Sequence, residues 1–198
     1  MQAQQLFFDG RWRTAVAAAV ARGELGLWDL RHESETVQHS PQWKSRLGFP
    51  EPQRADSTHF WRCRVHPEDL DAMTAAMLAH ARGELGCYEA CFRLRSNGSG
   101  YRLIHSRGRV VLRNADGRAL RMVGAMIDLT DRPLTPRAGL PDGLRDQMGA
   151  APLDLPFHQL LSDESAGVDP ARLLRERAQV LGQVEDLLQA AMAQLGRA

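Results

Sequence analysis

The chain of 198 residues has few cysteines, no long hydrophobic run and almost no excess charge. Cys63, Cys87 and Cys91 give an odd count without a CxxC motif, so we expect no disulfide framework and a reducing, cytoplasmic environment. A formal net charge of +1 provides no strong field for nucleic acid, which we do not expect as a partner. The alanine-rich run at 14–21 is too short to span a bilayer and comes after acidic Asp9, so neither a membrane anchor nor a signal peptide is expected.

The overall composition, with 43% hydrophobic and 25% charged side chains, indicates a globular protein. The length suits one domain with an extension, or two very small domains. Cys87 and Cys91 are four residues apart, which places them on one face of a strand, where a metal site completed by a histidine is one interpretation. We expect instead that they are small, buried, apolar side chains, and we expect no metal.

The stretch VHPEDLDAM at 65–73 marks the start of a helix. Pro67 suits the first helical turn, the acids directly after it complement the helix dipole, and apolar residues continue at helical spacing. His66 therefore lies at the cap or just outside it and needs no catalytic role. Residues 1–23 predict an N-terminal flanking helix, because a loose apolar stripe runs up to a plausible stop at Gly23.

Alternating apolar and polar residues predict five strands. Two are short, at 25–30 and 36–39, and three long ones come after the helix, joined by the turns SNGSG and NADG. A short helix is expected at 57–65, between the second strand and the long helix. A single five-stranded antiparallel sheet with helices on one face, an α+β fold, accommodates this order over residues 24–132.

Beyond this sheet the composition shifts. Residues 133–168 hold several prolines and predict a linker. Residues 169–198 predict an amphipathic helix, with Asp169 as its cap and Pro170 at its first position. A leucine recurs at every seventh position of this helix, as in a coiled coil, at Leu174, Leu181, Leu188 and Leu195. The stripe permits two arrangements, self-association of the chain into a homodimer or packing of the helix on its own domain.

The segment from Leu25 to Arg132 resembles a PAS domain, of the subgroup with a histidine–proline–acid signature before its long helix. The pieces LGLWDL, HSPQWKSRLGF and VHPEDLDAM, and three last strands that end in GAMIDLTDR, occur in the order of that family. The resemblance implies a curved sheet with helices that enclose a cleft. It also implies a sensory or protein-interaction role in bacterial signalling and not an enzyme. His66 and Pro67 would then belong to a structural signature.

The resemblance implies a module that binds a small ligand or a protein partner, dimerises and passes a signal to a downstream protein. The alternative is a ligand-free scaffold that only mediates assembly. A third interpretation is the input fragment of a larger signalling enzyme. The sequence lacks kinase glycine boxes, a GGDEF-like run and a helix-turn-helix reader, which argues against this third interpretation.

The implied cleft would be lined by apolar side chains of the helices and the sheet, although the same set also describes a filled core. The candidates are Trp43, Phe60, Trp61, Leu70, Met73, Met77, Phe92, Leu103 and Ile104. Asp128 and Thr130 close the last strand and either couple the sheet to the next segment of the chain or simply cap the strand end. Two departures from the family stand out, because Leu103 replaces a common tryptophan and Pro133 prevents the usual continuous signalling helix.

The sequence identifies no cofactor. Flavin-binding relatives carry a cysteine within Asn-Cys-Arg-Phe-Leu-Gln, and Cys63 lacks the flanking residues of that motif. Haem-binding relatives place a histidine on the long helix, where the only histidine is His80, for which we expect a surface position or a charge at the helix end. We therefore expect neither flavin nor haem. His105 is expected to be a hydrogen-bonded core residue, and His158 lacks the neighbouring acid of a phospho-accepting histidine.

Overall fold

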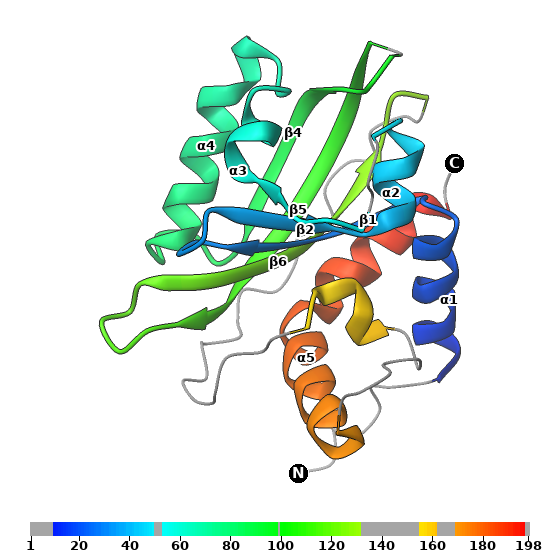
Figure 1. Ribbon diagram of the computed structural model, residues 1–198, viewed down its shortest axis with the longest axis vertical. Helices are drawn as coiled ribbons and strands as arrows, with labels where there is room; N and C mark the ends of the chain where they lie inside the picture. The colour runs from blue at the N-terminus through cyan, green and yellow to red at the C-terminus, as the bar shows by residue number, and fades with distance from the viewer. Residues whose placement is uncertain (1–9, 50–52, 99, 132–154, 162–168, 197–198) are drawn as a thin grey trace.

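The computed structural model describes residues 10–49, 53–98, 100–131, 155–161 and 169–196. Their central element is one curved, wholly antiparallel sheet in the order β3-β2-β1-β6-β5-β4 (Figure 1). The strands are β1 (Leu25–Arg31), β2 (Thr36–His39), β3 (Asp56–Ser57), β4 (Tyr88–Arg95), β5 (Tyr101–Arg113) and β6 (Ala119–Asp128). The antiparallel sheet and its three-strand meander are confirmed. The expected count of five strands was wrong, because the two-residue β3 is too short to show a sequence pattern.

Three helices cover one face of the sheet: α2 (Pro41–Arg46), α3 (Thr58–Arg62) and α4 (Pro67–Ala81). His66 is the N-cap of α4, where its Nδ1 accepts a hydrogen bond of 3.3 Å from the backbone N–H of Glu68. Arg93 of β4 ties the first turn of α4 to the sheet, since its Nε donates to Asp69 Oδ2 at 2.8 Å. These contacts hold α4 against the edge of the sheet, with space between them for the cavity described below.

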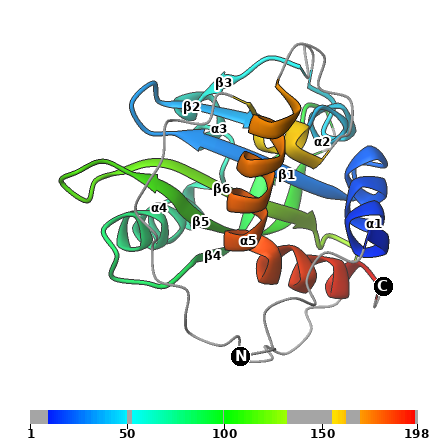
Figure 2. The ribbon, with the colours of Figure 1, turned by 90° about the horizontal axis from the view of Figure 1, so that it is seen from below.

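The opposite face of the sheet is also covered, so the expectation of helices on one face was wrong (Figures 1 and 2). The covering elements are α1 (Gly10–Ala21), the 3-10 helix η1 (Phe157–Leu161) and α5 (Pro170–Leu195). The physical reason is that β1 and β6 carry apolar side chains on both faces. Leu27 and Val123 pack toward α5 and η1, whereas Trp28 and Met122 pack toward α4 and α2.

The leucine stripe of α5 faces its own sheet. Leu181 and Leu188 are fully buried in the core beneath the sheet, and Leu195 packs against its margin. Only Leu174 remains exposed, with 59% of its surface accessible. Of the two arrangements that the leucine stripe permits, the structure has the one in which α5 packs on its own domain. In this position Leu181 and Leu188 are unavailable to another copy, so their role in a dimer interface stays a prediction that requires α5 to leave the sheet.

Part of the expected linker at 133–168 is ordered in the core. Phe157, Leu160 and Leu161 of η1 are buried beside α5. Asp29 accepts a hydrogen bond of 3.1 Å from the Phe157 N–H, and Arg177 of α5 donates to the Leu160 carbonyl at 2.6 Å. Residues 132–154 and 162–168 lie outside the described part of the chain. The sequence of η1 shows no regular period, so only the tertiary contacts reveal that it docks.

No helix in the described part of the chain combines the length and the apolar character needed to cross a membrane.

Candidate functional site

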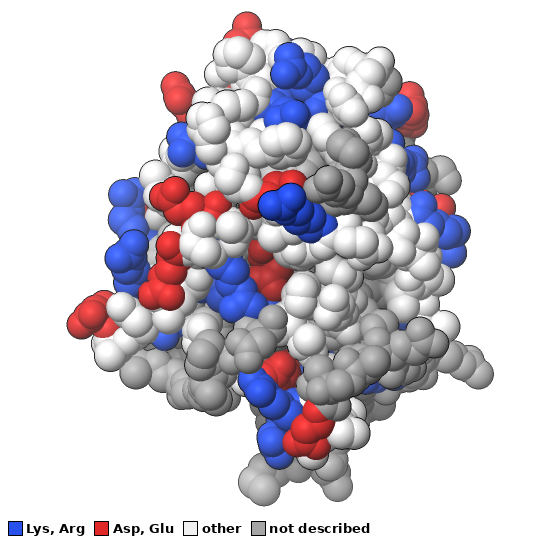
Figure 3. Space-filling view, in the orientation of Figure 1, with Lys and Arg blue, Asp and Glu red and all other residues white. Residues whose placement is uncertain are grey.

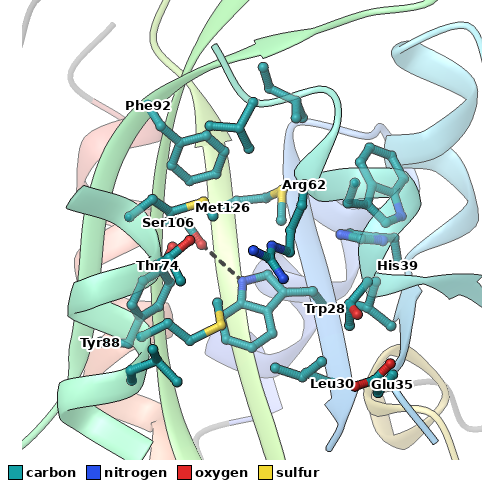
Figure 4. Close-up of a pocket in the computed structure, with 18 of the residues that line it drawn as sticks. Trp28, Leu30, Glu35, His39, Arg62, Thr74, Tyr88, Phe92, Ser106 and Met126 are labelled. Carbon is teal, nitrogen blue, oxygen red and sulfur yellow. Dashed lines mark hydrogen bonds between the residues drawn. The ribbon is translucent and has the colours of Figure 1, made fainter. Parts of the chain in front are cut away.

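A cavity of about 320 Å³ lies between the sheet and the helices α3 and α4. Its walls come from β1, β2, β4, β5 and β6 on one side and from the two helices on the other (Figure 4). Most of the lining is apolar, contributed by Trp28, Leu30, Val37, Trp61, Val65, Met73, Met77, Leu78, Tyr88, Phe92, Leu94 and Met126. The polar or charged lining residues are His32, Glu35, His39, Thr58, Arg62, Thr74 and Ser106.

The floor of the cavity is built around Trp28. A Cβ atom added at Gly108 would lie 2.3 Å from the Trp28 ring, and one added at Gly124 would lie 2.4 Å from it. These two glycines pair across β5 and β6, and any side chain there would displace the indole. The indole Nε1 donates a hydrogen bond of 3.1 Å to Ser106 Oγ. Tyr88 stands edge-on to Trp28, and burial raises the pKa of its phenol well above the ordinary value, so it stays neutral.

His39 forms part of the wall next to α3. It is buried, and its ring packs on Trp61 with ring centroids 4.4 Å apart. Burial lowers the pKa of His39 to about 3, with the nearby Lys44 charge acting in the same direction and Asp56 opposing both. Lys44 and Asp56 form a pair at 2.8 Å, and Asp56 also accepts from Trp61 Nε1 at 3.0 Å. His39 is therefore a neutral hydrogen-bonding group at physiological pH.

Three lining residues present buried polar atoms that lack a hydrogen-bond partner among the described residues: His39 Nδ1, His32 Nε2 and Thr74 Oγ1. An unsatisfied buried polar atom costs about 1–3 kcal/mol, so native proteins contain few of them. Burial also lowers the pKa of His32, assisted by the charges of Arg118 and Arg113. These three atoms give the mostly apolar wall of the cavity an unpaired polar component.

The mouth of the cavity carries two charges of opposite sign. Arg62, at the end of α3, is exposed and has no ion-pair or hydrogen-bond partner for its side chain among the described residues. Glu35 lies in the β1–β2 turn, where its carbonyl accepts a hydrogen bond of 2.8 Å from the Thr58 N–H. Its φ of +50° makes Glu35 the one described non-glycine residue in the left-handed region, where glycine is the usual choice.

Four of the nine cleft candidates line this cavity: Trp61, Met73, Met77 and Phe92. Trp43, Phe60, Leu70 and Ile104 belong to the same core without lining the space. Leu103 lies on the opposite face of the sheet, packed against the core beneath α5. The inclusion of Leu103 together with Ile104 was wrong, because consecutive residues of a strand point to opposite faces.

The residues that form the floor and the polar end of the cavity were not predicted from the sequence. Trp28, Ser106 and Tyr88 form its floor, and His39 and Arg62 form its polar end. The alternation within LGLWDL already assigned Trp28 and Leu27 to opposite faces of the sheet, so this pattern could have identified Trp28 as a cavity residue. The role of His39 depends on a neighbour in α3 that no local pattern specifies.

Asp128 and Thr130 form a compact cap at the end of β6. Asp128 Oδ1 accepts from the Thr130 N–H at 2.9 Å, and Thr130 Oγ1 accepts from the Leu103 N–H at 3.0 Å. Arg102 donates to Asp128 Oδ2 at 3.3 Å. These bonds tie β6 to β5 at the point where the chain leaves the sheet. Their part in signal coupling remains a prediction.

The histidines considered as cofactor ligands are occupied by other contacts. His80 is buried, so the expectation of a surface position was wrong. Its Nδ1 lies 2.7 Å from the Leu85 carbonyl, and its Nε2 accepts from the Val110 N–H at 2.9 Å. His105 is a hydrogen-bonded core residue, as expected, with its two ring nitrogens 3.0 Å from Gln194 Oε1 and from Glu89 Oε1.

The cysteines do not form a site. Cys63 and Cys91 are exposed and Cys87 is half-buried, so the expectation that Cys87 and Cys91 are buried was wrong. Cys63 Sγ lies 3.3 Å from His59 Nε2 on the outer side of α3. Among the described residues, no three or more histidine, cysteine, aspartate or glutamate side chains are grouped as metal ligands.

Residues 36–126 match the model of a family described as the PAS fold. A sensory box histidine kinase/response regulator from Burkholderia thailandensis shares 31% identity over 58% of this chain and 84% of its own, with a TM-score of 0.49. The N-terminal domain of a diguanylate cyclase with PAS/PAC sensor from Marinobacter aquaeolei shares 22% identity over 54% and 95%, with a TM-score of 0.47. A domain of a putative light and redox sensing histidine kinase from Haloarcula marismortui shares 20% over 54% and 90%, with a TM-score of 0.45. No curated protein sequence matches.

Proposed function

The chain contains a domain of the PAS family, and we propose that it is a signalling sensor module whose cavity binds a small molecule. The observation that carries this proposal is the cavity itself. Its volume of about 320 Å³ falls within the range of small-molecule sites, and its lining is largely apolar with a few polar atoms. Protein interiors leave few voids of this size and few unpaired polar atoms. A ligand would fill the space and supply the missing hydrogen bonds.

The strands that line the cavity also hold the C-terminal segment. On β5, Ser106 faces the cavity, whereas its neighbour His105 lies 3.0 Å from Gln194 of α5 on the other face. On β1, Trp28 faces the cavity, whereas Asp29 binds the backbone of η1. A ligand that moves either strand therefore alters the contacts of η1 and α5. Binding would shift an existing equilibrium between docked and released forms of this segment.

The released segment would be the output of the module, and its receiver would be a signalling protein. That protein is either a separate partner or the remainder of a longer chain. The role proposed here is sensory and not catalytic, in the cytoplasm. Among the described residues on the face shown in Figure 3, acidic and basic side chains are interspersed, which does not favour nucleic acid as the partner.

A second function, that of a ligand-free assembly scaffold, is favoured by a different observation. The amphipathic helix α5 carries leucines at every seventh position, and Leu174 at its start is exposed. Self-association through the whole stripe would first require α5 to leave its own sheet, which exposes Leu181 and Leu188. Dimerisation and release of α5 are therefore coupled in this alternative, and neither needs a ligand.

Native mass spectrometry of the freshly purified protein, with an absorbance spectrum of the same sample, separates the two functions. A discrete adduct mass that disappears on denaturation would support the sensor and give the mass of the ligand. A colourless dimer without an adduct would favour the scaffold. Hydrogen exchange of α5 amides before and after ligand removal would then test the coupling. Unchanged exchange would contradict release of this segment as the output.

A further inference from the structure

We propose that the cavity is built for an amphipathic ligand with an acidic head group, a carboxylate held at Arg62 and His39 and an apolar body held between α4 and the sheet. This inference rests on the proposed sensor function and names the chemical class of its ligand. Carboxylates are the class considered because the guanidinium group matches them in shape, charge and hydrogen-bond geometry.

Arg62 is the cation that such a head group would meet. Figure 4 shows its guanidinium directed into the cavity, above the Trp28 ring. Arginine side chains that line apolar space usually find a carboxylate or a carbonyl, and the Arg62 side chain has neither among the described residues. Because Arg62 sits at the exposed mouth, it keeps its hydration in the empty state and can bind an anion without being buried itself.

His39 supplies the second contact. Its ring packs on Trp61, the residue that precedes Arg62, so the two side chains belong to the same end of the cavity (Figure 4). His39 is 5% exposed, and its Nδ1 has no partner among the described residues. The neutral ring carries one N–H, and the tautomer with that hydrogen on Nδ1 would donate to a carboxylate oxygen. His39 lines the cavity, and its unpartnered Nδ1 is a recognition element that a purely apolar ligand would leave unused.

Arg62 is the charge at this end that is left for an anion. Lys44 is paired with Asp56 at 2.8 Å, so that pair contributes no net positive charge. Glu35 is the one carboxylate among the described lining residues. It lies at the start of α3 beside Thr58, whereas Arg62 lies at the end of that helix, about one turn away. An acidic ligand would place its head at the Arg62 end and its body away from Glu35.

The body of the ligand would occupy the apolar part of the cavity. Met73 and Met77 of α4 face Phe92 and Met126 of the sheet across this space. Methionine side chains adapt to ligands of different shape and make favourable contacts with aromatic rings. A phenyl ring or a branched alkyl group therefore suits the space, and Thr74 offers one further hydroxyl to a polar substituent.

Isothermal titration of the full chain with 3-phenylpropanoate and with 3-phenylpropanamide tests the acid class. The two probes share size and shape and differ in charge. We expect the carboxylate to bind about tenfold more tightly at neutral pH, the effect of one charge-assisted contact of about 1.4 kcal/mol. Arg62→Gln should abolish this ratio and leave the affinity for the amide unchanged. Arg46→Gln, which removes an exposed charge outside the cavity, is the matched control and should preserve the ratio.

Two further variants test which side chains lie near the carboxylate of the ligand. Glu35→Gln should tighten binding of the carboxylate, because it removes a like charge from the mouth. His39→Leu should weaken binding of the carboxylate more than that of the amide, without loss of stability, because it removes an unpartnered polar atom. In long-range ¹H–¹⁵N spectra, the carboxylate should shift the His39 ring nitrogens, and the shift should be absent when the ligand binds elsewhere.

The possible results test two proposals separately: that the ligand is an acid, and that the cavity binds a small molecule. Equal affinity for both probes, or a ratio that survives Arg62→Gln, would overturn the acid class and leave the cavity as a binding site for neutral molecules. Failure of both probes to bind at millimolar concentration, with the His39 signals unchanged, would count against the cavity as a small-molecule site and thus against both proposals. Loss of binding of both probes in Arg62→Gln would assign Arg62 to the shape of the cavity and not to charge recognition.

Discussion

Replacing Asp29 by asparagine would test what holds the C-terminal segment on the sheet. Asp29 and Arg121 are 2% and 0% exposed, and Arg121 Nε donates to Asp29 Oδ1 at 2.9 Å. Both residues also bind the tail, because Asp29 accepts from the Phe157 N–H and Arg121 donates to the Leu155 carbonyl at 2.8 Å. The pair thus joins β1 and β6 to the segment that precedes α5.

The expected loss is large because asparagine keeps the size of the side chain and removes its charge. Arg121 would remain fully buried as an uncompensated cation. Breaking a buried pair in this way costs about 3–5 kcal/mol, a major part of the roughly 5–15 kcal/mol that stabilises a typical domain. Arg31 lies 3.4 Å from Asp29 with a side chain that is 30% exposed. Arg31→Gln should therefore cost less than about 1 kcal/mol and serves as the control.

Urea unfolding followed by tryptophan fluorescence measures these free energies, and hydrogen exchange locates the effect. We expect Asp29→Asn to increase exchange in η1 and α5 before it affects β4 and β5. The double variant Asp29→Leu/Arg121→Met should recover the part of the loss that comes from the uncompensated charge, but not the hydrogen bonds to the Phe157 N–H and the Leu155 carbonyl. A loss below about 1 kcal/mol in Asp29→Asn, or exchange that rises equally in all elements, would refute the role assigned to this pair.

Three other predictions concern the cavity floor, a titrating wall residue and the docking of α5. Gly124→Ala should lower the free energy of unfolding in urea by about 1–3 kcal/mol, because its Cβ would lie 2.1 Å from the Arg107 carbonyl oxygen. As a control, Gly182→Ala lies in open space on α5 and should raise the free energy of unfolding by about 0.5–1 kcal/mol. The folded-state pKa of His39, about 3, lies below the unfolded value near 6.5, so the unfolded chain binds more protons between these pH values. Stability should therefore fall by up to about 1.4 kcal/mol per unit as the pH drops through this window, and His39→Leu should flatten that slope in unfolding measured from neutral to acid pH. Arg109→Met removes two bonds of 2.7 Å to Asp186 and should accelerate hydrogen exchange in the middle of α5 without reaching β4; unchanged exchange would show that apolar packing alone docks the helix.

The sequence predicted those parts of the fold that depend on local patterns. The histidine and proline at 66–67 begin α4 because the cap, the fixed φ of proline and the acidic first turn all act within a few residues. The meander of β4, β5 and β6 results from alternation and from turns such as NADG, where Asn114 Oδ1 accepts from the Arg118 N–H at 2.8 Å. These elements, in the order of the PAS family, were sufficient to identify the fold.

The site was less accessible to sequence reasoning. Phe92, Met73 and Met77 were identified because an apolar residue on a half-buried strand or helix faces the core. Leu103 was misplaced because it was named together with Ile104, although alternation lets only one of two consecutive strand residues face the cavity; the register of β5 decides which one. Arg62 and Glu35 were not identified, since a charge at a cavity mouth resembles any other surface charge in a sequence.

The sequence by itself determined the order of the five longer strands and of the long helices, the antiparallel sheet, the cap of α4 and the amphipathic character of the last helix. Each of these is a property of neighbouring residues or of a short period. The tertiary structure alone decided which surface the leucines of α5 cover, that η1 docks beneath Asp29, and that His39, Thr74 and Arg62 surround one cavity. Those features join residues far apart in the chain, and their energies arise only when burial removes water from both partners.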